Sequence, residues 1–145
     1  MQAHIMSILT AKQIRTQNYY SSNNLFSLMV EHHVFKTQIV MKLNSETVNT
    51  RDIPWTFDFL QKNLPTILAS TCFNDEHIPF AIEVTRTELG HLFEHILLEY
   101  LCQEKLLKGC DEAVFSGRTK WNWEKEPFGL FHIYITMRSS DVELF

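Results

Sequence analysis

Two histidines and a glutamate with helical spacing stand near the middle of the chain, in the segment His91-Leu92-Phe93-Glu94-His95. An α-helix turns about 100° per residue, so His95 would lie about 40° from His91 and Glu94 about 60° to the other side. The three side chains would share one face within a single turn. Two imidazoles at i and i+4 can bind one Zn²⁺, and a carboxylate between them can take a proton from a water molecule at the metal.

This order of residues inverts the better-known His-Glu-x-x-His pattern and is the inverzincin signature. Zinc lowers the pKa of its water towards about 7, where a glutamate can accept the proton. The motif therefore predicts one zinc ion, with His91 and His95 as ligands and Glu94 as the general base. The alternative is a chance match, which is a known risk with short motifs.

A zinc site also needs a third protein ligand, and three side chains are candidates. Glu99 lies one turn beyond His95, about 80° round from His91, and is the nearest acid on the same helix. It could instead hydrogen-bond to an imidazole, or be an ordinary exposed helix residue. His132 and His77 are the other two candidates, and the residues themselves leave the choice open.

The helix that carries the motif is the clearest element of the sequence. Thr85-Arg86-Thr87-Glu88 has the form of a capping box and predicts that the helix begins there and runs to about Lys108. We expect the face opposite His91 to be the core face and the histidine face to lie in a partly covered cleft. The expected core residues are Leu89, Phe93, Ile96 and Tyr100.

The remaining elements indicate an α+β fold. Strands are expected over residues 5–15, 38–43 and 130–137, with a short extended stretch over 80–84. Residues 17–24 and 121–124 are interpreted as loops and 116–119 as a turn. An amphipathic helix is expected after Pro54, kinked or ended by Pro65. We expect a small antiparallel or mixed sheet with two main helices packed on it, in one domain over residues 1–145 whose tail, 138–145, frays.

Composition narrows the possible function. The 145 residues suit one domain, and a hydrophobic content of 45 % is enough for a core. The net charge of -4 and the scattered Lys and Arg argue against a nucleic-acid partner.

Three cysteines without a Cys-x-x-Cys pair suggest reduced thiols. With no signal peptide and no apolar run of about 18 residues, we expect a cytoplasmic protein that does not enter membranes. The oligomeric state stays open.

The stretch from Gly90 to Glu99 resembles the N-terminal domain of cyanophycin synthetase, whose corresponding helix reads like Gly-His-x-x-Glu-His-Val-Ala-Leu-Glu. Further similar segments follow in the same order, from about residue 8 to residue 136. They are Asn18-Tyr19-Tyr20-Ser21, Ile39–Leu43, Ile53-Pro54 with Phe57, Leu60 and Leu64-Pro65, Gly117-Arg118-Thr119, and Gly129–Tyr134.

The resemblance implies an α+β domain that binds cyanophycin, a polyaspartate backbone with arginine side chains. In some family members the domain also cleaves this polymer at a zinc-metallopeptidase-like site, which makes primers for synthesis. The resemblance implies that His91 and His95 are ligands and Glu94 the general base, and gives Glu99 a family counterpart. It also implies that Arg118 could pair with a substrate carboxylate, or else with a local acidic group.

Two departures from the family pattern concern the substrate. The loop after Arg118 is rich in tryptophan where the family's loop is charged, and the loop before the motif helix keeps only Cys72 of a Cys- and Gly-rich stretch. The chain has no segment like the synthetase's ATP-using domains, so we expect a stand-alone homologue. Tyr19 and Trp121, with Tyr20 and Trp123, could line a recognition surface or simply pack.

Two functions from different classes follow. The first is a zinc-dependent metallohydrolase that cleaves amide bonds in a peptide or a cyanophycin-like polymer, with Arg118, Tyr19 and Trp121 at the substrate and a separate synthetase as a potential partner. The second is a non-catalytic module that binds a polymer or a protein and has a degenerate or structural metal site. Glu94 separates the two, because binding alone does not require a general base.

Overall fold

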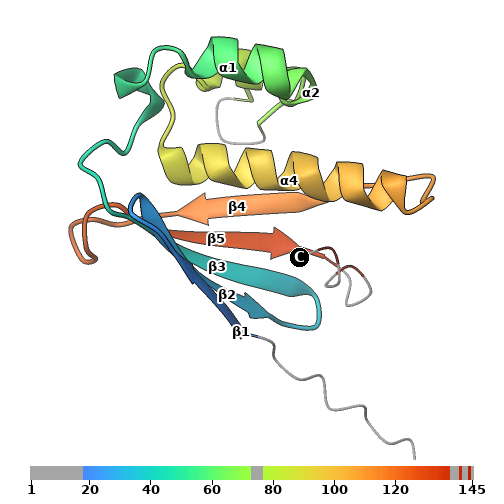
Figure 1. The fold of residues 1–145 in the computed structure, drawn as a ribbon, viewed down its shortest axis with the longest axis horizontal. Helices are drawn as coiled ribbons and strands as arrows, with labels where there is room; N and C mark the ends of the chain where they lie inside the picture. Colours follow the sequence, from blue (N-terminus) through green and yellow to red (C-terminus); the bar gives the residue numbers. More distant parts are fainter. Residues whose placement is uncertain (1–17, 73–76, 138–140, 142–143, 145) are drawn as a thin grey trace, which may run out of the picture.

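A sheet with all its helices on one side forms the framework of the molecule (Figure 1). The computed structural model describes residues 18–72, 77–137, 141 and 144. Among these residues, five antiparallel strands lie in the order β1-β2-β3-β5-β4. The strands are β1 (Asn18–Ser22), β2 (Phe26–His32), β3 (Lys36–Leu43), β4 (Ser116–Lys120) and β5 (Leu130–Thr136). The expected α+β fold is therefore confirmed, with a purely antiparallel sheet.

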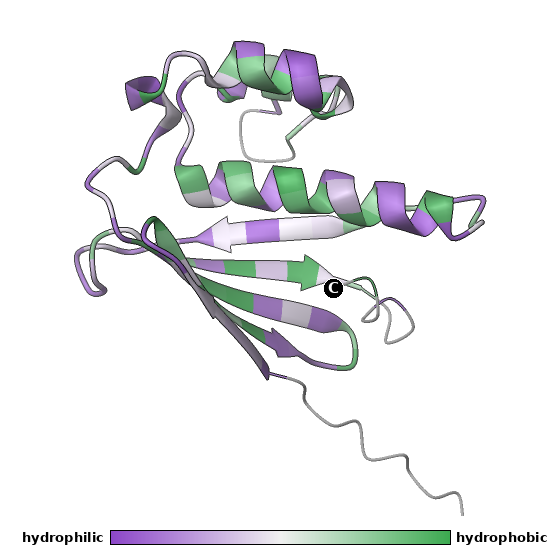
Figure 2. Ribbon diagram, in the orientation of Figure 1, coloured by the Kyte–Doolittle hydropathy of each residue, from purple (hydrophilic) through white to green (hydrophobic). Residues whose placement is uncertain are grey.

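The neighbouring strands β3 and β5, inside the sheet, show why one of its faces is buried. Both strands are rich in hydrophobic residues (Figure 2), and fully buried positions alternate with less buried ones, because successive side chains of a strand point to opposite faces. One face is buried and packs against the helices, and the other is more exposed. The buried set on these two strands is Ile39, Met41, Leu43, Phe131, Ile133 and Ile135.

The long helix α4 (Leu89–Leu107) lies across the buried face of the sheet. Leu89, Phe93 and Leu97 pack against the core cluster of the sheet, and Leu101 belongs to it. Gly90 lets the helix approach β5 closely, because a Cβ at this position would stand 2.3 Å from Cγ of Phe131. The first turns of α4, which carry the histidines, are therefore held tightly against the sheet.

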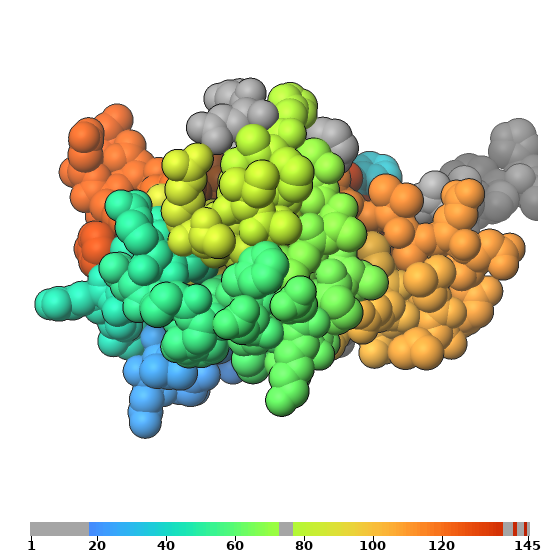
Figure 3. All heavy atoms as spheres, turned by 90° about the horizontal axis from the view of Figure 1, so that it is seen from above, coloured from blue at the N-terminus to red at the C-terminus, as the bar shows by residue number. Residues whose placement is uncertain are grey.

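Three short helices form a second layer on top of α4. They are α1 (Thr56–Asn63), α2 (Pro65–Leu68) and α3 (Phe80–Glu83), preceded by a 3₁₀ turn, η1 (Thr50–Asp52). Seen from above, this layer covers the beginning of α4, while the end of α4 projects beyond it (Figure 3). Its core is a second apolar cluster to which α4 contributes Leu92 and Ile96; the buried members are Leu60, Leu64, Ile67, Phe80 and Val84.

Because α4 lies between two layers, the expected single core face was wrong. Leu89 and Phe93 face the sheet, whereas Ile96 faces the second layer. Tyr100 is 51 % exposed and belongs to neither cluster. The histidine face is partly covered by the second layer, as expected, with the His91 side chain 15 % exposed.

Four local predictions also need correction. Residues 18–22 of the expected loop form the edge strand β1, and the expected turn at residues 116–119 is part of β4. The extended stretch expected over residues 80–84 is the helix α3. The capping box does not form, because α4 begins at Leu89 after Glu88, which makes no side-chain cap. The strand expected over residues 5–15 lies outside the described residues.

Candidate metal centre

The two histidines of the motif face each other at the start of α4. Nε2 of His91 and Nε2 of His95 lie 3.2 Å apart. This proximity follows from their i, i+4 spacing, which places both side chains on one side of the helix. Two nitrogen atoms at this distance can share a proton or bind the same metal ion.

Cys72 completes a group of three donor atoms. It lies between α2 and α3, in a segment fixed by the bridge between Thr71 and Pro79. Its Sγ is 3.4 Å from Nε2 of His91, and the donor atoms of Cys72, His91 and His95 all lie within 4.8 Å of one another. These three residues could hold a metal ion.

The separations can be compared with those of a tetrahedral zinc site. Zinc–nitrogen bonds of about 2.0–2.1 Å and a zinc–sulfur bond of about 2.3 Å, at tetrahedral angles, separate two ligand atoms by roughly 3.3–3.6 Å. The His91–His95 and Cys72–His91 distances of 3.2 and 3.4 Å lie close to this range. Two of the three separations therefore suit one tetrahedral ion, and the third, between Cys72 and His95, is within 4.8 Å.

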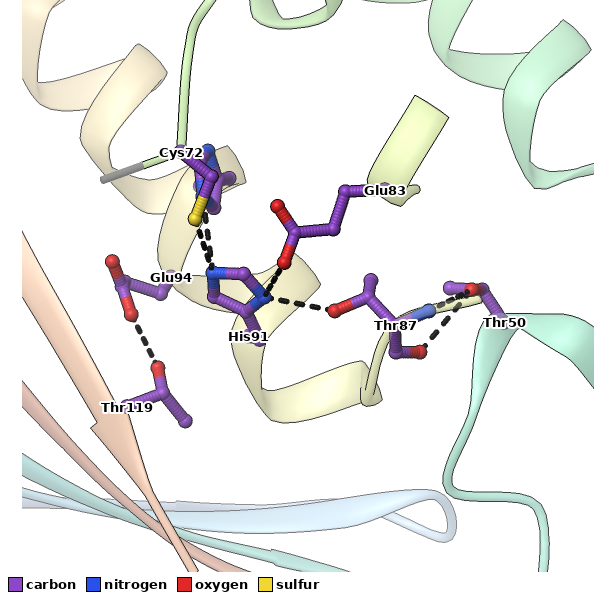
Figure 4. Close-up of polar contacts among 8 residues, drawn as sticks. Thr50, Cys72, Glu83, Thr87, His91, Glu94 and Thr119 are labelled. Atoms are coloured by element: carbon purple, nitrogen blue, oxygen red, sulfur yellow. Dashed lines mark hydrogen bonds and ion pairs between the residues drawn. The ribbon is translucent and has the colours of Figure 1, made fainter. Parts of the chain in front are cut away.

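The other ring nitrogen of His91 has partners that orient the imidazole (Figure 4). Nδ1 lies 2.8 Å from Oγ1 of Thr87 and 3.7 Å from Oε1 of Glu83. Thr87 is itself anchored, since its backbone N–H donates to Oγ1 of Thr50 over 2.9 Å. A proton on Nδ1 would be stabilised by the hydroxyl and the carboxylate, which leaves the lone pair of Nε2 for a metal.

His95 lies in an apolar setting that keeps it neutral. Its ring stacks on Phe80 with centroids 3.9 Å apart, and the residue is 9 % exposed. Burial, followed by the nearby His91, lowers the pKa of His95 to about 3. A neutral imidazole is the form that binds a metal.

Glu94 points from α4 to strand β4. Oγ1 of Thr119 donates to Oε2 of Glu94 over 2.5 Å (Figure 4). Gly117 makes room for the carboxylate, because a Cβ there would stand 2.6 Å from Oε1 of Glu94. Burial raises the pKa of Glu94, although the hydrogen bond from Thr119 and the nearby His91 act in the opposite direction.

The structure places the other predicted ligands elsewhere. The carboxylate of Glu99 accepts hydrogen bonds from Thr66 and from Nε2 of Gln103, the latter over 2.8 Å. His132 pairs with Glu126 over 2.7 Å, and His77 is exposed. Among the described residues, Cys72 is thus the donor that joins the two imidazoles, and Glu99 is not part of the group.

The three predicted substrate residues are not brought to the metal centre. Arg118 lies on β4 but is exposed, and its neighbour Thr119 is the residue that turns towards Glu94. Tyr19 is on β1, at the opposite edge of the sheet from β4. Trp121 follows β4 and packs edge-on against Phe131, with ring centroids 5.8 Å apart. Their roles in substrate binding stay predictions.

Sequence reasoning missed the partners that come from outside the motif. Cys72 and Thr119 reach the helix only through the tertiary fold, so no local spacing reveals them. Thr87 had a detectable signal, because it precedes His91 by four residues, the spacing at which side chains meet on a helix. Thr87 contacts His91 at this spacing although it lies just before the first residue of the helix, Leu89.

Comparison with known proteins places this arrangement in a family. The model of the cyanophycin synthase-like N-terminal domain matches residues 38–141, which is more than half of the chain. The chain belongs to this family. Its matched span includes Cys72, His91, Glu94 and His95 and omits Tyr19. No curated protein and no solved structure matches the chain.

Membership of the cyanophycin synthase-like N-terminal domain family relates the chain to cyanophycin metabolism. The resemblance seen in the sequence is thereby confirmed. None of the helices among the described residues is both long and apolar enough to cross a membrane.

Proposed function

We propose that this domain is a zinc-dependent metallohydrolase that cleaves amide bonds in a peptide or a cyanophycin-like polymer. The observation that carries the proposal is the group of Cys72, His91 and His95, whose donor atoms lie within 4.8 Å of one another, with two of the separations close to those of a tetrahedral site. Three protein ligands leave a fourth position open, as in catalytic zinc sites, whereas structural zinc sites usually have four protein ligands.

The donor set favours zinc over the alkaline-earth cations. A thiolate and two imidazoles suit zinc, whereas Mg²⁺ and Ca²⁺ take oxygen ligands. The orientation of His91 by Thr87 and Glu83 supports the same conclusion, since ligand imidazoles donate their second N–H to an oxygen acceptor.

Glu94 is the residue that would move the proton. A zinc ion at this site would supply a Lewis acid for the amide carbonyl and lower the pKa of a water molecule. One carboxylate oxygen of Glu94, Oε2, is held by Thr119, which leaves Oε1 to accept the proton from the attacking water. Glu94 would then pass this proton to the nitrogen of the departing amine, so that one amide bond breaks for each water consumed.

The family relation supports the choice of substrate. A cyanophycin-like polymer contains both backbone peptide bonds and side-chain amide bonds, and either is chemically open to this site. We infer that short products would serve a separate synthetase as primers.

One observation favours a second function, a non-catalytic binding module. Glu94 is 4 % exposed and its carboxylate lies against Thr119 and Gly117 of β4, so a substrate could reach it only if the surrounding residues moved. In that case the metal would hold the second layer on α4, and the domain would bind polymer or protein without cleaving it.

Substitution Glu94→Gln separates the two functions. The hydrolase predicts that the purified wild-type protein with zinc releases soluble fragments from cyanophycin, and that Glu94→Gln keeps the zinc but loses the release. A matched control is Glu104→Gln, which removes an exposed acid from the same helix and should keep both. The same polymer binding in wild type and Glu94→Gln, with hydrolysis in neither, would support the module instead.

A further inference from the structure

Among the described residues, no helix covers the face of the sheet that points away from α4 (Figure 1). The strand register shows which residues lie on it, because paired residues of neighbouring strands share a face. Across β3, β5 and β4, one row consists of Gln38, Tyr134 and Arg118 and the next of Val40, His132 and Lys120. Lys36 pairs with Thr136 in the row on the other side of Tyr134.

This face carries positive charge on a chain that is negative overall. On the strands β3, β5 and β4 it holds Lys36, Lys42, Arg118 and Lys120 and no acidic residue, whereas the net charge of the chain is -4. Two acids border these residues: Glu31 of β2 pairs with Gln38, and Glu126 is bonded to Nε2 of His132. Lys42 is engaged, since Nζ donates to the backbone oxygen of Leu43 over 2.7 Å. We call Lys36, Arg118 and Lys120, with Tyr134 between them, the cationic sheet face.

The three charges of the cationic sheet face form no direct ion pair with a described acidic residue. Lys36, Arg118 and Lys120 are exposed, and none of the ion pairs in the described part of the chain involves them. Nζ of Lys36 and Nζ of Lys120 lie 6.0 and 5.9 Å from the ring centre of Tyr134. Such cation–π contacts restrict the ammonium groups without removing their charge.

We propose that the cationic sheet face binds an extended acidic polypeptide with carboxylates on alternate residues. Arg118 and Lys120 are two residues apart on one strand, so their positions are separated by about 6.6–6.8 Å along it. An extended peptide presents every second side chain on one face at the same repeat. Its successive carboxylates can therefore pair with Arg118 and Lys120 in turn, and Lys36 lies two strands away to pair with a third.

The same contacts argue against a nucleic acid. Single strands bind by stacking bases on aromatic rings beside cations. Lys36 and Lys120 already lie over the ring of Tyr134, so a base could stack on this ring only by displacing them.

This surface is separate from the metal centre. Thr119 lies between Arg118 and Lys120 on β4 and points to the other face of the sheet, where it bonds to Glu94. Binding here therefore requires neither zinc nor Glu94, and its test does not depend on the proposed hydrolase.

The test is fluorescence anisotropy with a labelled peptide of alternating Glu and Thr, at low salt. We expect wild type to bind this peptide, to lose affinity as salt is added, and to ignore a peptide of alternating Gln and Thr. The triple variant Lys36→Gln/Arg118→Gln/Lys120→Gln should bind about tenfold more weakly, the sum of three exposed charge pairs.

A second triple variant controls for the change in net charge. Lys62→Gln/Arg86→Gln/Lys108→Gln removes three exposed cations from the helical side and should bind within about twofold of wild type. The proposal is overturned if wild type does not bind the acidic peptide, or if both triple variants weaken equally. Tighter binding of an oligothymidylate of equal charge would also overturn it, in favour of a nucleic-acid surface.

Discussion

At the scale of single residues, the candidate metal centre includes a thiol that the motif does not contain. Cys72 and His91 are 19 residues apart in the chain, yet Sγ and Nε2 are 3.4 Å apart in the fold. Glu99, the nearest acid on the same helix, has its carboxylate held by Thr66 and Gln103. The prediction to test first at this scale is therefore that Cys72, and not Glu99, is the third ligand.

Substitution Cys72→Ala should reduce zinc affinity by on the order of 100-fold or more. Loss of a residue that only hydrogen-bonds to a ligand already reduces metal affinity by about 10–100-fold, and Cys72 would be a ligand itself. Competition with a chromophoric zinc chelator measures the affinity. Glu99→Gln should leave it within about threefold, since this residue is outside the group. A large loss in Glu99→Gln, with Cys72→Ala unchanged, would reverse the assignment.

Substitution Thr87→Val should weaken zinc binding by about 10–100-fold while leaving the fold intact. The hydroxyl that receives the Nδ1 proton of His91 is lost, whereas the backbone bonds between Thr87 and Thr50 remain. The same chelator competition measures the change. Thr85→Val is the matched control, because among the described residues the hydroxyl of Thr85 bonds to the backbone oxygen of Ile82 and not to His91. Equal affinities in the two variants would argue against a role for Thr87.

At the scale of elements, the position of α4 between two layers decides what surrounds the motif. Leu89 and Phe93 pack on the sheet, and Leu92 and Ile96 pack on the second layer. The helix therefore has two apolar faces, one towards each layer. A prediction that assumes one buried face per helix could not find the second.

Gly90 tests how tightly α4 is held against the sheet. Helix propensity alone predicts that Gly90→Ala stabilises the protein by about 0.5–1 kcal/mol. The Cβ would stand 2.3 Å from Cγ of Phe131, a ring with no exposed surface, and overpacking of this kind costs about 1–3 kcal/mol. We expect the second effect to win, so that urea unfolding shows a lower free energy of unfolding for the variant; a more stable variant would mean that the contact relaxes freely.

The elements that were mispredicted have physical explanations. Ser116-Gly117 has the composition of a turn, but Gly117 is needed inside β4 because Glu94 occupies the space of its side chain. The β-branched Ile82 and Val84 favour an extended stretch, yet Val84 is fully buried in the second layer and α3 forms there. In both cases tertiary packing outweighs local preference. The helix of the motif was predictable from its length between Thr85 and Gly109, and β3 and β5 from their β-branched and aromatic residues.

At the scale of the whole molecule, the proposed zinc joins two layers of the fold. Cys72 belongs to the second layer, and His91 and His95 belong to α4. The sequence predicted the family, the fold class and two donors of the site from contiguous segments. It could not predict the pairing of Cys72 with the motif, because that contact exists only once the second layer has packed on α4.

Zinc should therefore raise the thermal stability of the whole domain. At a free zinc concentration of about 100 times Kd, binding adds about 2.7 kcal/mol, which for a chain of this size raises Tm by about 5–10 °C. Differential scanning calorimetry with and without chelator measures the shift. In Cys72→Ala the shift should fall close to zero at the same zinc concentration; an undiminished shift would place the ion somewhere else.

The most direct test of the metal centre is elemental analysis of the purified protein, with wild type and His91→Ala/His95→Ala prepared side by side. The account predicts about one zinc per chain in wild type and none in the double variant, with both proteins folded by circular dichroism. Wild-type protein that contains no metal and takes up none when zinc is added would contradict the metal centre and, with it, the proposed hydrolase.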